Sequence, residues 1–181
     1  MSATRWQVPV TALRRAVGAR QREERTGTLG ELRVVETRVP ADAVTSVEVV
    51  LSAVVGGIEV VGTVGSTWRG VCRRCLRPIG GSIVAPVREL YRPGGGDDDT
   101  YPLGGDQLDL EPLARDALLL GLPLAPLCRE DCRGLCPRCG AELADGPCAC
   151  GPEPADARWA ALDGLRSDPG AGGLPPPVGN G

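Results

Sequence analysis

The sequence contains no histidine and no lysine, so all 20 basic residues among its 181 positions are arginine. Without histidine there is no Ser–His–Asp or Cys–His nucleophile, no histidine general base and no histidine metal ligand. Any zinc site must therefore be built from thiolates or carboxylates. Phenylalanine is also absent and aromatic residues make up only 3%, so Val, Leu, Ile and Ala have to form the core.

Long apolar runs are missing as well. None approaches the ~20 residues that span a bilayer, and the N-terminal residues lack the apolar centre of a signal peptide. We therefore expect a cytoplasmic protein with no membrane partner. In that reducing compartment, the eight cysteines are more typical of metal binding than of disulfides.

Charge is unevenly distributed along the chain. Residues 1–92 carry 14 arginines against eight acidic residues, whereas residues 93–181 carry six arginines against 15 acidic residues. Such polarity suggests a basic face for an anionic partner. The alternative is that the two halves neutralise each other in the fold.

The pattern predicts an α+β fold, in which an antiparallel β-meander is covered by one or two helices and followed by a Cys-rich zinc ribbon or knuckle. Residues 1–92 supply the N-terminal helix and the basic meander. Within them, residues 8–20 read as a short helix and residues 19–30 as a mobile charged loop. Residues 31–92 read as four or five strands, with a hairpin turn at Gly56-Gly57.

The second half divides into shorter segments. Residues 93–105 form an acidic, Gly-rich linker, and residues 106–127 a leucine-rich helix that packs on the sheet. Asp109 can cap that helix, and its apolar face comprises Leu110, Leu113, Ala114, Ala117, Leu118 and Leu120. Residues 128–150 bind zinc, residues 151–168 form a short amphipathic helix, and residues 169–181 are a disordered tail.

Cysteine spacing is the most specific signal in the chain. Cys136-Pro-Arg-Cys139-Gly140 has the form of a zinc knuckle, in which two thiolates two residues apart supply half of a tetrahedral site. Either Cys148 and Cys150 or Cys128 and Cys132 could complete it. The upstream pair Cys72 and Cys75 has the same knuckle spacing, so the eight thiols make either two four-thiolate sites or one site with spare thiols.

A structural zinc ion fits this pattern better than a catalytic one, since no acid stands beside an open position. We therefore predict no enzymatic activity and no small-molecule substrate. A thiol redox enzyme that uses Cys72 and Cys75 is a weaker alternative, because the expected βαβ setting is missing.

The arginines around the upstream pair are the candidate nucleic-acid contacts. They are opposed in residues 68–92 by Glu89 alone and comprise Arg69, Arg73, Arg74, Arg77, Arg88 and Arg92. A solvated basic face is the other interpretation of these residues.

The order of these features resembles the YceD family, also called the large ribosomal RNA accumulation protein family. The resemblance rests on Cys72-Arg-Arg-Cys75-Leu76, the acidic linker, the leucine helix ending in Leu122-Pro123, and the closing cysteines with Asp156-Ala-Arg158-Trp159. It spans about residues 5 to 166. It implies a ribosome-biogenesis factor that supports synthesis, processing or stability of large-subunit ribosomal RNA, with ribosomal RNA or a large-subunit ribosomal protein as partner. The resemblance assigns no catalytic residue. The alternative is a zinc-stapled adaptor that binds a ribosomal protein.

Overall fold

The computed structural model describes residues 3–95, 99–144, 146–151, 158 and 162. Most of the predicted amphipathic helix at residues 151–168, and all of the tail at residues 169–181, lie outside the described residues. No helix in the described part of the chain is long and apolar enough to cross a membrane.

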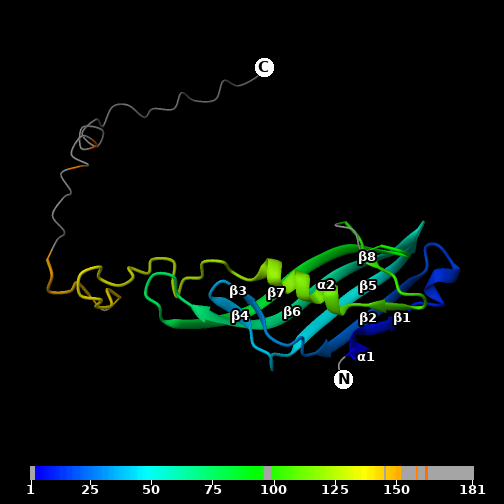
Figure 1. Ribbon diagram of the computed structural model, residues 1–181, viewed down its shortest axis with the longest axis horizontal. Helices are drawn as coiled ribbons and strands as arrows, with labels where there is room; N and C mark the ends of the chain where they lie inside the picture. Colours follow the sequence, from blue (N-terminus) through cyan, green and yellow to red (C-terminus); the bar gives the residue numbers. More distant parts are fainter. Residues whose placement is uncertain (1–2, 96–98, 145, 152–157, 159–161, 163–181) are drawn as a thin grey trace, which may run out of the picture.

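A mostly antiparallel sheet of seven strands forms the body of the molecule (Figure 1). Its central strand, β6, pairs along one edge with β5 and then β4, and along the other edge with β7. The strands of this sheet are β2 (Arg20–Gly27), β3 (Leu32–Val34), β4 (Thr37–Val39), β5 (Thr45–Val54), β6 (Gly57–Val71), β7 (Pro78–Arg92) and β8 (Tyr101–Pro102). The predicted meander over residues 31–92 therefore holds five strands, β3 to β7.

The remaining elements lie near the chain's start and in its second half. A second, two-stranded sheet pairs β1 with β9 and so brings the N-terminal segment against the start of the helix. These elements are α1 (Ala3–Trp6), β1 (Gln7–Pro9), the short 3-10 helix η1 (Leu13–Arg15), β9 (Gln107–Asp109) and α2 (Glu111–Gly121).

Alternating burial gives the sheet two distinct faces. On β5, Val47, Val49 and Leu51 are buried, whereas Glu48 and Val50 between them are exposed. The buried positions form one core with the inward residues of the neighbouring strands and of α2. The opposite face, called here the outer face, carries no helix among the described residues.

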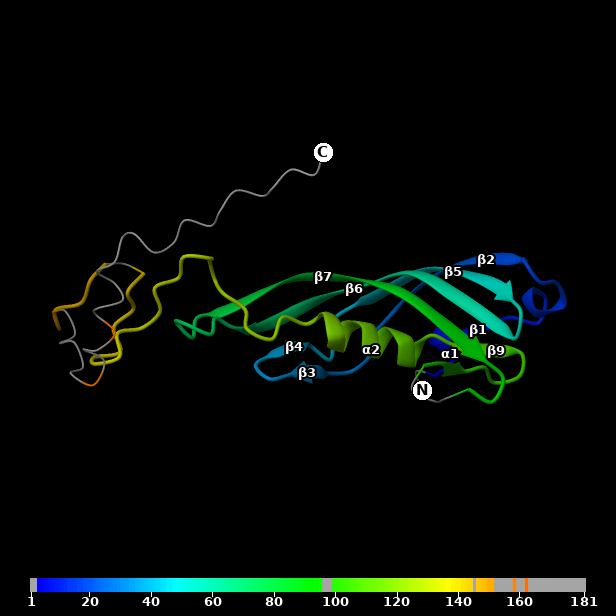
Figure 2. The same ribbon diagram turned by 90° about the horizontal axis from the view of Figure 1, so that it is seen from above.

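Helix α2 covers the inner face of the sheet (Figure 2). Asp109, the predicted cap, lies one residue before the N-cap Leu110, and its Oδ1 accepts a hydrogen bond from the Glu111 backbone N–H at 2.9 Å. Leu113 and Leu118 are fully buried under the sheet. Leu120, however, was expected on the same face and is 89% exposed. It lies beside β7 ahead of Tyr91, where no described strand pairs with the outer edge of β7 to cover it.

Two predictions in the first thirty residues are wrong. Residues 8–20 are not a helix: Val8 and Pro9 belong to β1, and only η1 is helical. Residues 19–30 are not a loop, because β2 pairs with β5 over eight residues. The apolar signal is missing from β2 since its inward side chains form a polar network. There, Gln21 donates to Glu23 at 2.7 Å and Arg25 pairs with Glu23 at 2.5 Å. Charges on an edge strand also discourage further strand pairing.

The predicted linker at residues 93–105 is also more ordered than expected where the structure describes it. Its residues Tyr101 and Pro102 form β8, which pairs in parallel with the end of β7. The Tyr101 ring stacks on Tyr91 with 5.1 Å between centroids, and its hydroxyl donates to Asp116 at 2.8 Å. With these two contacts, Tyr101 anchors the segment. The surrounding glycines and aspartates hide this order from an interpretation based on sequence alone.

Candidate metal centres

The first cysteine group joins two parts of the chain that are far apart in sequence. Cys72 and Cys75 lie at the tip of the β6–β7 hairpin, whereas Cys128 and Cys132 lie in the segment after α2. Figure 1 shows that this segment runs beside the hairpin tip. The Sγ atoms of all four residues lie within 4.8 Å of one another.

The geometry of this first group fits a metal ion rather than disulfides. The Sγ atoms of Cys72 and Cys132 are 3.7 Å apart, as are those of Cys75 and Cys128. Four sulfurs at ~2.3 Å from a central zinc ion would stand about 3.8 Å apart at the corners of a tetrahedron. A disulfide needs about 2.05 Å. The four thiols therefore have the spacing that a four-thiolate site requires.

The second cysteine group is local in sequence. It comprises Cys136, Cys139, Cys148 and Cys150, whose Sγ atoms also lie within 4.8 Å of one another. The structure thus divides the eight cysteines into two sets of four, each of which could hold a metal ion. The segment 128–150, which the sequence suggested as one unit, contributes to both.

Both groups begin with the same backbone turn. In the first, the Cys72 N–H donates to Arg77 O and the Leu76 N–H donates to Cys72 O, each at 2.9 Å. In the second, the Cys136 N–H donates to Ala141 O at 2.8 Å and the Gly140 N–H donates to Cys136 O at 2.9 Å. The residue after the second cysteine has a positive φ in each turn, +61° at Leu76 and +71° at Gly140. This turn directs both thiols of a Cys-x-x-Cys pair to one point.

Two of the predicted RNA-contacting arginines join the cysteine segments. Arg74 donates to the Cys132 carbonyl at 2.7 Å and more weakly to the Glu130 carbonyl at 3.4 Å. Arg77 forms an ion pair with Glu142, in the hairpin turn of the second group. These contacts dock the segment after α2 onto the hairpin tip without any metal.

The other four predicted arginines are spread over the molecule. Arg69 lies on the outer face of β6, and Arg73 is exposed at the hairpin tip. Arg88 pairs with Glu59 at 3.3 Å near the far end of the sheet, where Arg92 ends β7. The structure therefore does not gather the six residues into one patch.

Sequence reasoning missed two arginines that do lie beside Arg69. Arg33 on β3 and Arg38 on β4 occupy neighbouring positions on the same face. The only signal was that each stands between apolar or β-branched residues in a three-residue strand, Leu-Arg-Val and Thr-Arg-Val. Their proximity to Arg69 depends on strand pairing, which the sequence pattern does not specify.

The thiols of the two groups differ in their tendency to ionise. Burial raises the pKa of Cys72, but backbone N–H groups of Cys75, Cys128 and Arg74 outweigh it and lower that pKa to about 6. Backbone N–H groups of Cys139 and Arg138 likewise lower the pKa of Cys136 to about 6. These N–H groups stabilise the thiolate, the form that binds metal.

Other thiols in each group keep their protons. A hydrogen bond with the Cys132 thiol, together with burial, raises the pKa of Cys128 to about 12. A hydrogen bond with the Cys139 thiol raises that of Cys150 to about 12. The Arg77 N–H favours the Cys75 thiolate, but burial and the Cys72 thiol outweigh it and raise the pKa of Cys75. Each group therefore has protons to release when a metal ion replaces them.

Curated proteins with a similar sequence come from mycobacteria and a plant. An uncharacterized protein of Mycobacterium tuberculosis is 40% identical over 113 residues, which cover 59% of this chain and 54% of the relative. An uncharacterized protein of Mycobacterium leprae is 32% identical over 124 residues, or 65% and 55% of the two chains. The chain thus spans about half the length of these relatives.

The plant relative carries a functional name. It is the chloroplastic "Large ribosomal RNA subunit accumulation protein YCED homolog 1" of Arabidopsis thaliana, 32% identical over 66 residues, which cover 36% of this chain and 21% of the relative. No solved structure matches the chain. A profile of the family described as "Large ribosomal RNA subunit accumulation protein YceD" matches residues 60–166, which include most of β6, all of β7 and α2, and every cysteine. On this match over more than half of its length, the chain belongs to the YceD family.

Proposed function

We propose that this chain is a non-catalytic ribosome-biogenesis factor that supports synthesis, processing or stability of large-subunit ribosomal RNA. The family match over residues 60–166 carries the proposal. Its partner would be ribosomal RNA or a large-subunit ribosomal protein, and it would act in the cytoplasm. Neither a membrane nor a small-molecule substrate is part of this role.

The test is depletion of the protein in its own host. Large-subunit ribosomal RNA should fall relative to small-subunit ribosomal RNA, and expression of the intact chain should restore the ratio. An unchanged ratio, with depletion verified, would overturn the proposed function.

In this role the two cysteine groups would each hold one structural zinc ion. The 3.7 Å sulfur–sulfur distances support four-thiolate ligation at the first group. When bound, zinc would supply folding free energy rather than chemistry, since all four positions around it are taken by protein. The first ion would fix the segment after α2 to the sheet, and the second would close the local hairpin.

Metal content of the reduced, purified protein tests this ligand assignment. We expect two zinc ions per chain, and one in each of the variants Cys72→Ser and Cys148→Ser. The double variant should contain none. A single zinc ion in the intact chain, or iron with sulfide, would contradict two structural zinc sites.

The same residues support the proposed lack of enzymatic activity. The sequence offers no histidine base, and Cys72 is fully buried, whereas redox-active cysteines are partly exposed. A Cys72 thiol that reacts with a small alkylating reagent faster than free cysteine, in the metal-loaded protein, would favour the redox alternative.

A protein-binding adaptor is the second candidate function. The observation in its favour is the acidic second half of the chain, with 15 acidic residues against six arginines in residues 93–181. Such a surface suits a basic ribosomal protein. A ribosomal partner that stays bound after nuclease treatment would favour the adaptor over direct contact with RNA.

A further inference from the structure

Three arginines lie side by side across three strands. Arg33 on β3 is directly opposite Arg38 on β4, and Arg38 is directly opposite Arg69 on β6. All three are exposed on the outer face, away from α2, since Leu32 and Thr37 beside them are buried. We call these three residues the arginine row.

Like charges directly opposite each other on neighbouring strands repel. The row is only partly neutralised: Arg33 faces Glu36 and Arg38 faces Glu31, each at 3.8 Å. These distances are too long for hydrogen bonds, and all four side chains are about half exposed or more. In the described part of the chain, no acidic group lies within ion-pair distance of Arg69. The row therefore keeps a net positive charge.

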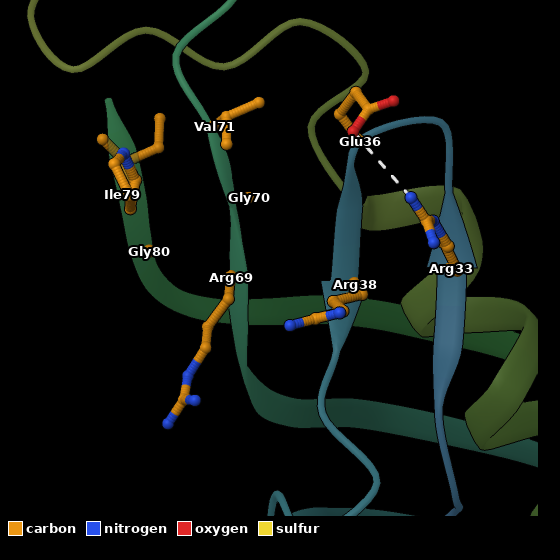
Figure 3. A pocket seen from close by; sticks show the side chains of 9 residues that line it. Arg33, Glu36, Arg38, Arg69, Gly70, Val71, Ile79 and Gly80 are labelled. Carbon is orange, nitrogen blue, oxygen red and sulfur yellow. Dashed lines mark ion pairs between the residues drawn. The ribbon is translucent and has the colours of Figure 1, made fainter. Parts of the chain in front are cut away.

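The row borders a hollow of about 630 Å³. Figure 3 shows Arg38 reaching from β4 towards β6, and Arg69 extending into the space beside its own strand. On the other side of Arg69 the paired residue is Gly80, which has no side chain. A Cβ at Gly80 would lie 2.6 Å from the Trp68 carbonyl oxygen. Gly80 therefore excludes a side chain on the face that Arg69 occupies, and the hollow stays open.

One arginine of the row is held in place before any ligand arrives. The Arg33 Nε donates to the carbonyl of Val35 at 3.1 Å. Val35 is the exposed turn residue of the β3–β4 hairpin and has a φ of +51°, which a β-branched residue rarely adopts. The turn thus keeps a strained residue whose carbonyl orients a cation at the hollow.

The shape and charge of the hollow match a chain of phosphates. Guanidinium groups bind phosphate oxygens through paired hydrogen bonds. Neighbouring strands are ~4.8 Å apart, so the row extends over ~10 Å. That length exceeds a single phosphate and suits successive phosphates along a strand. Val71 and its paired residue Pro78 line the hollow on the same face as Arg69 and add apolar surface beside the cations, which sugars and bases can cover.

We propose that the arginine row is a binding site for the phosphate backbone of RNA. The proposal rests on the proposed function, and it moves the contact from the hairpin tip to the outer face of β3, β4 and β6. Arg69 is shared between the two locations. Arg74 and Arg77 instead act within the molecule, through Cys132 and Glu142.

The test measures binding of a fluorescently labelled, mixed-sequence single-stranded RNA to the zinc-loaded chain over a range of salt concentrations. The variant Arg33→Gln/Arg38→Gln/Arg69→Gln should bind at least about tenfold more weakly at low salt. The slope of log affinity against log salt should flatten by about 2, at roughly 0.7 per lost phosphate contact. The single variant Arg69→Gln should show about a third of this change in slope.

A matched control has the same loss of charge on the same face. Arg20→Gln/Arg22→Gln/Arg88→Gln removes three exposed arginines at the other end of the sheet. There, Arg22 on β2 pairs with Val50 on β5, Val50 pairs with Val61 on β6, and Val61 pairs with Arg88 on β7. Val61 is eight residues from Arg69 on β6, or ~26 Å along the strand. This control should bind RNA within about twofold of the intact chain.

Three results would overturn the proposal. The first is unchanged affinity and slope in the row variant, and the second is equal weakening in both triple variants, which would mean a diffuse basic surface. The third is unchanged RNA affinity together with loss of a nuclease-resistant protein partner, which would assign the row to an acidic protein. Thermal unfolding controls for folding, and Arg69→Gln should not lower the melting temperature, because it relieves repulsion with Arg38.

The inference and the proposed function can fail separately. If depletion leaves ribosomal RNA unchanged while the row variant loses RNA binding, the function is wrong and the site stands. If depletion lowers large-subunit ribosomal RNA and the row variant restores it with full RNA affinity, the function stands and the site is wrong.

Discussion

Leu76 occupies a backbone conformation that normally belongs to glycine. Its φ is +61° and its side chain is 61% exposed, so no core contact compensates the strain. A side chain in the left-handed region costs about 1–2 kcal/mol. The equivalent position in the second cysteine group is Gly140, which adopts φ +71° without that cost. The two turns are the same structure built with different residues.

The substitution Leu76→Gly should leave the metal-loaded protein as stable or stabilise it by up to ~1 kcal/mol, because relief of strain offsets the greater freedom of glycine in the unfolded chain. Urea unfolding measures this. Leu120→Gly is the control, since Leu120 is also exposed but helical, and it should cost ~1 kcal/mol. Equal losses from both substitutions would contradict the strain argument.

At the same scale, the cysteine spacing predicted thiolate metal sites but could not pair the thiols. Cys75 and Cys128 are 53 positions apart, and only the folded hairpin shows that they meet. The two pairs share their spacing in the sequence, but Leu76 hid the shared turn conformation, because the glycine that marks the second turn is absent from the first. The arginine row was missed for a related reason, since Arg38 and Arg69 become neighbours through strand pairing alone.

Among the elements, the hairpin of β5 and β6 depends on a glycine for close approach rather than for a turn. A Cβ at Gly62 would lie 2.0 Å from the Glu48 carbonyl oxygen and 2.7 Å from the Val49 Cα. Both contacts are with backbone of the paired strand, so neither can move aside cheaply. Gly65 differs, because its nearest neighbour would be the Ser46 hydroxyl at 2.9 Å, which can rotate away.

We therefore expect Gly62→Ala to destabilise the protein by about 2–3 kcal/mol, since β5 and β6 must separate locally. Gly65→Ala should cost less than ~1 kcal/mol. Thermal unfolding of the two variants at equal zinc content compares them directly. A Gly62→Ala protein as stable as Gly65→Ala would show that the strands separate without cost at this point.

Elements with a plain pattern were predictable, and those held by tertiary contacts were not. The alternation in β5 and the capped leucine helix α2 follow from local sequence, as Val47, Val49 and Asp109 illustrate. Strand β2 was missed because its inward residues are polar and its order comes from eight paired residues of β5. Strand β1 was missed because its partner, β9, lies about a hundred positions further along the chain.

For the molecule as a whole, the first cysteine group links protonation to the attachment of the segment after α2. Cys75 and Cys128 hold their protons at neutral pH, because their pKa values are raised. Metal binding must therefore release at least these two protons. Affinity then rises with pH and falls on acidification, by at least about 100-fold per pH unit near neutrality.

Chelator competition on the Cys148→Ser variant, which should retain only the first site, measures this dependence. Calorimetry in buffers of different ionisation enthalpy counts the released protons independently. A pH-independent affinity, or fewer than two protons released, would mean that the thiols are already ionised in the metal-free protein.

The first cysteine group also closes the part of the chain between residues 75 and 128 into a ring. With a metal ion joining Cys72 and Cys75 to Cys128 and Cys132, everything from β7 to α2 becomes a loop closed at a single point. Length changes within residues 93–100, ahead of β8, would enlarge or shrink this ring without moving its closure. A single protease cut in the same stretch would open the ring yet leave both pieces tethered through the metal. The chain can therefore tolerate insertion and nicking there, provided that the metal stays bound.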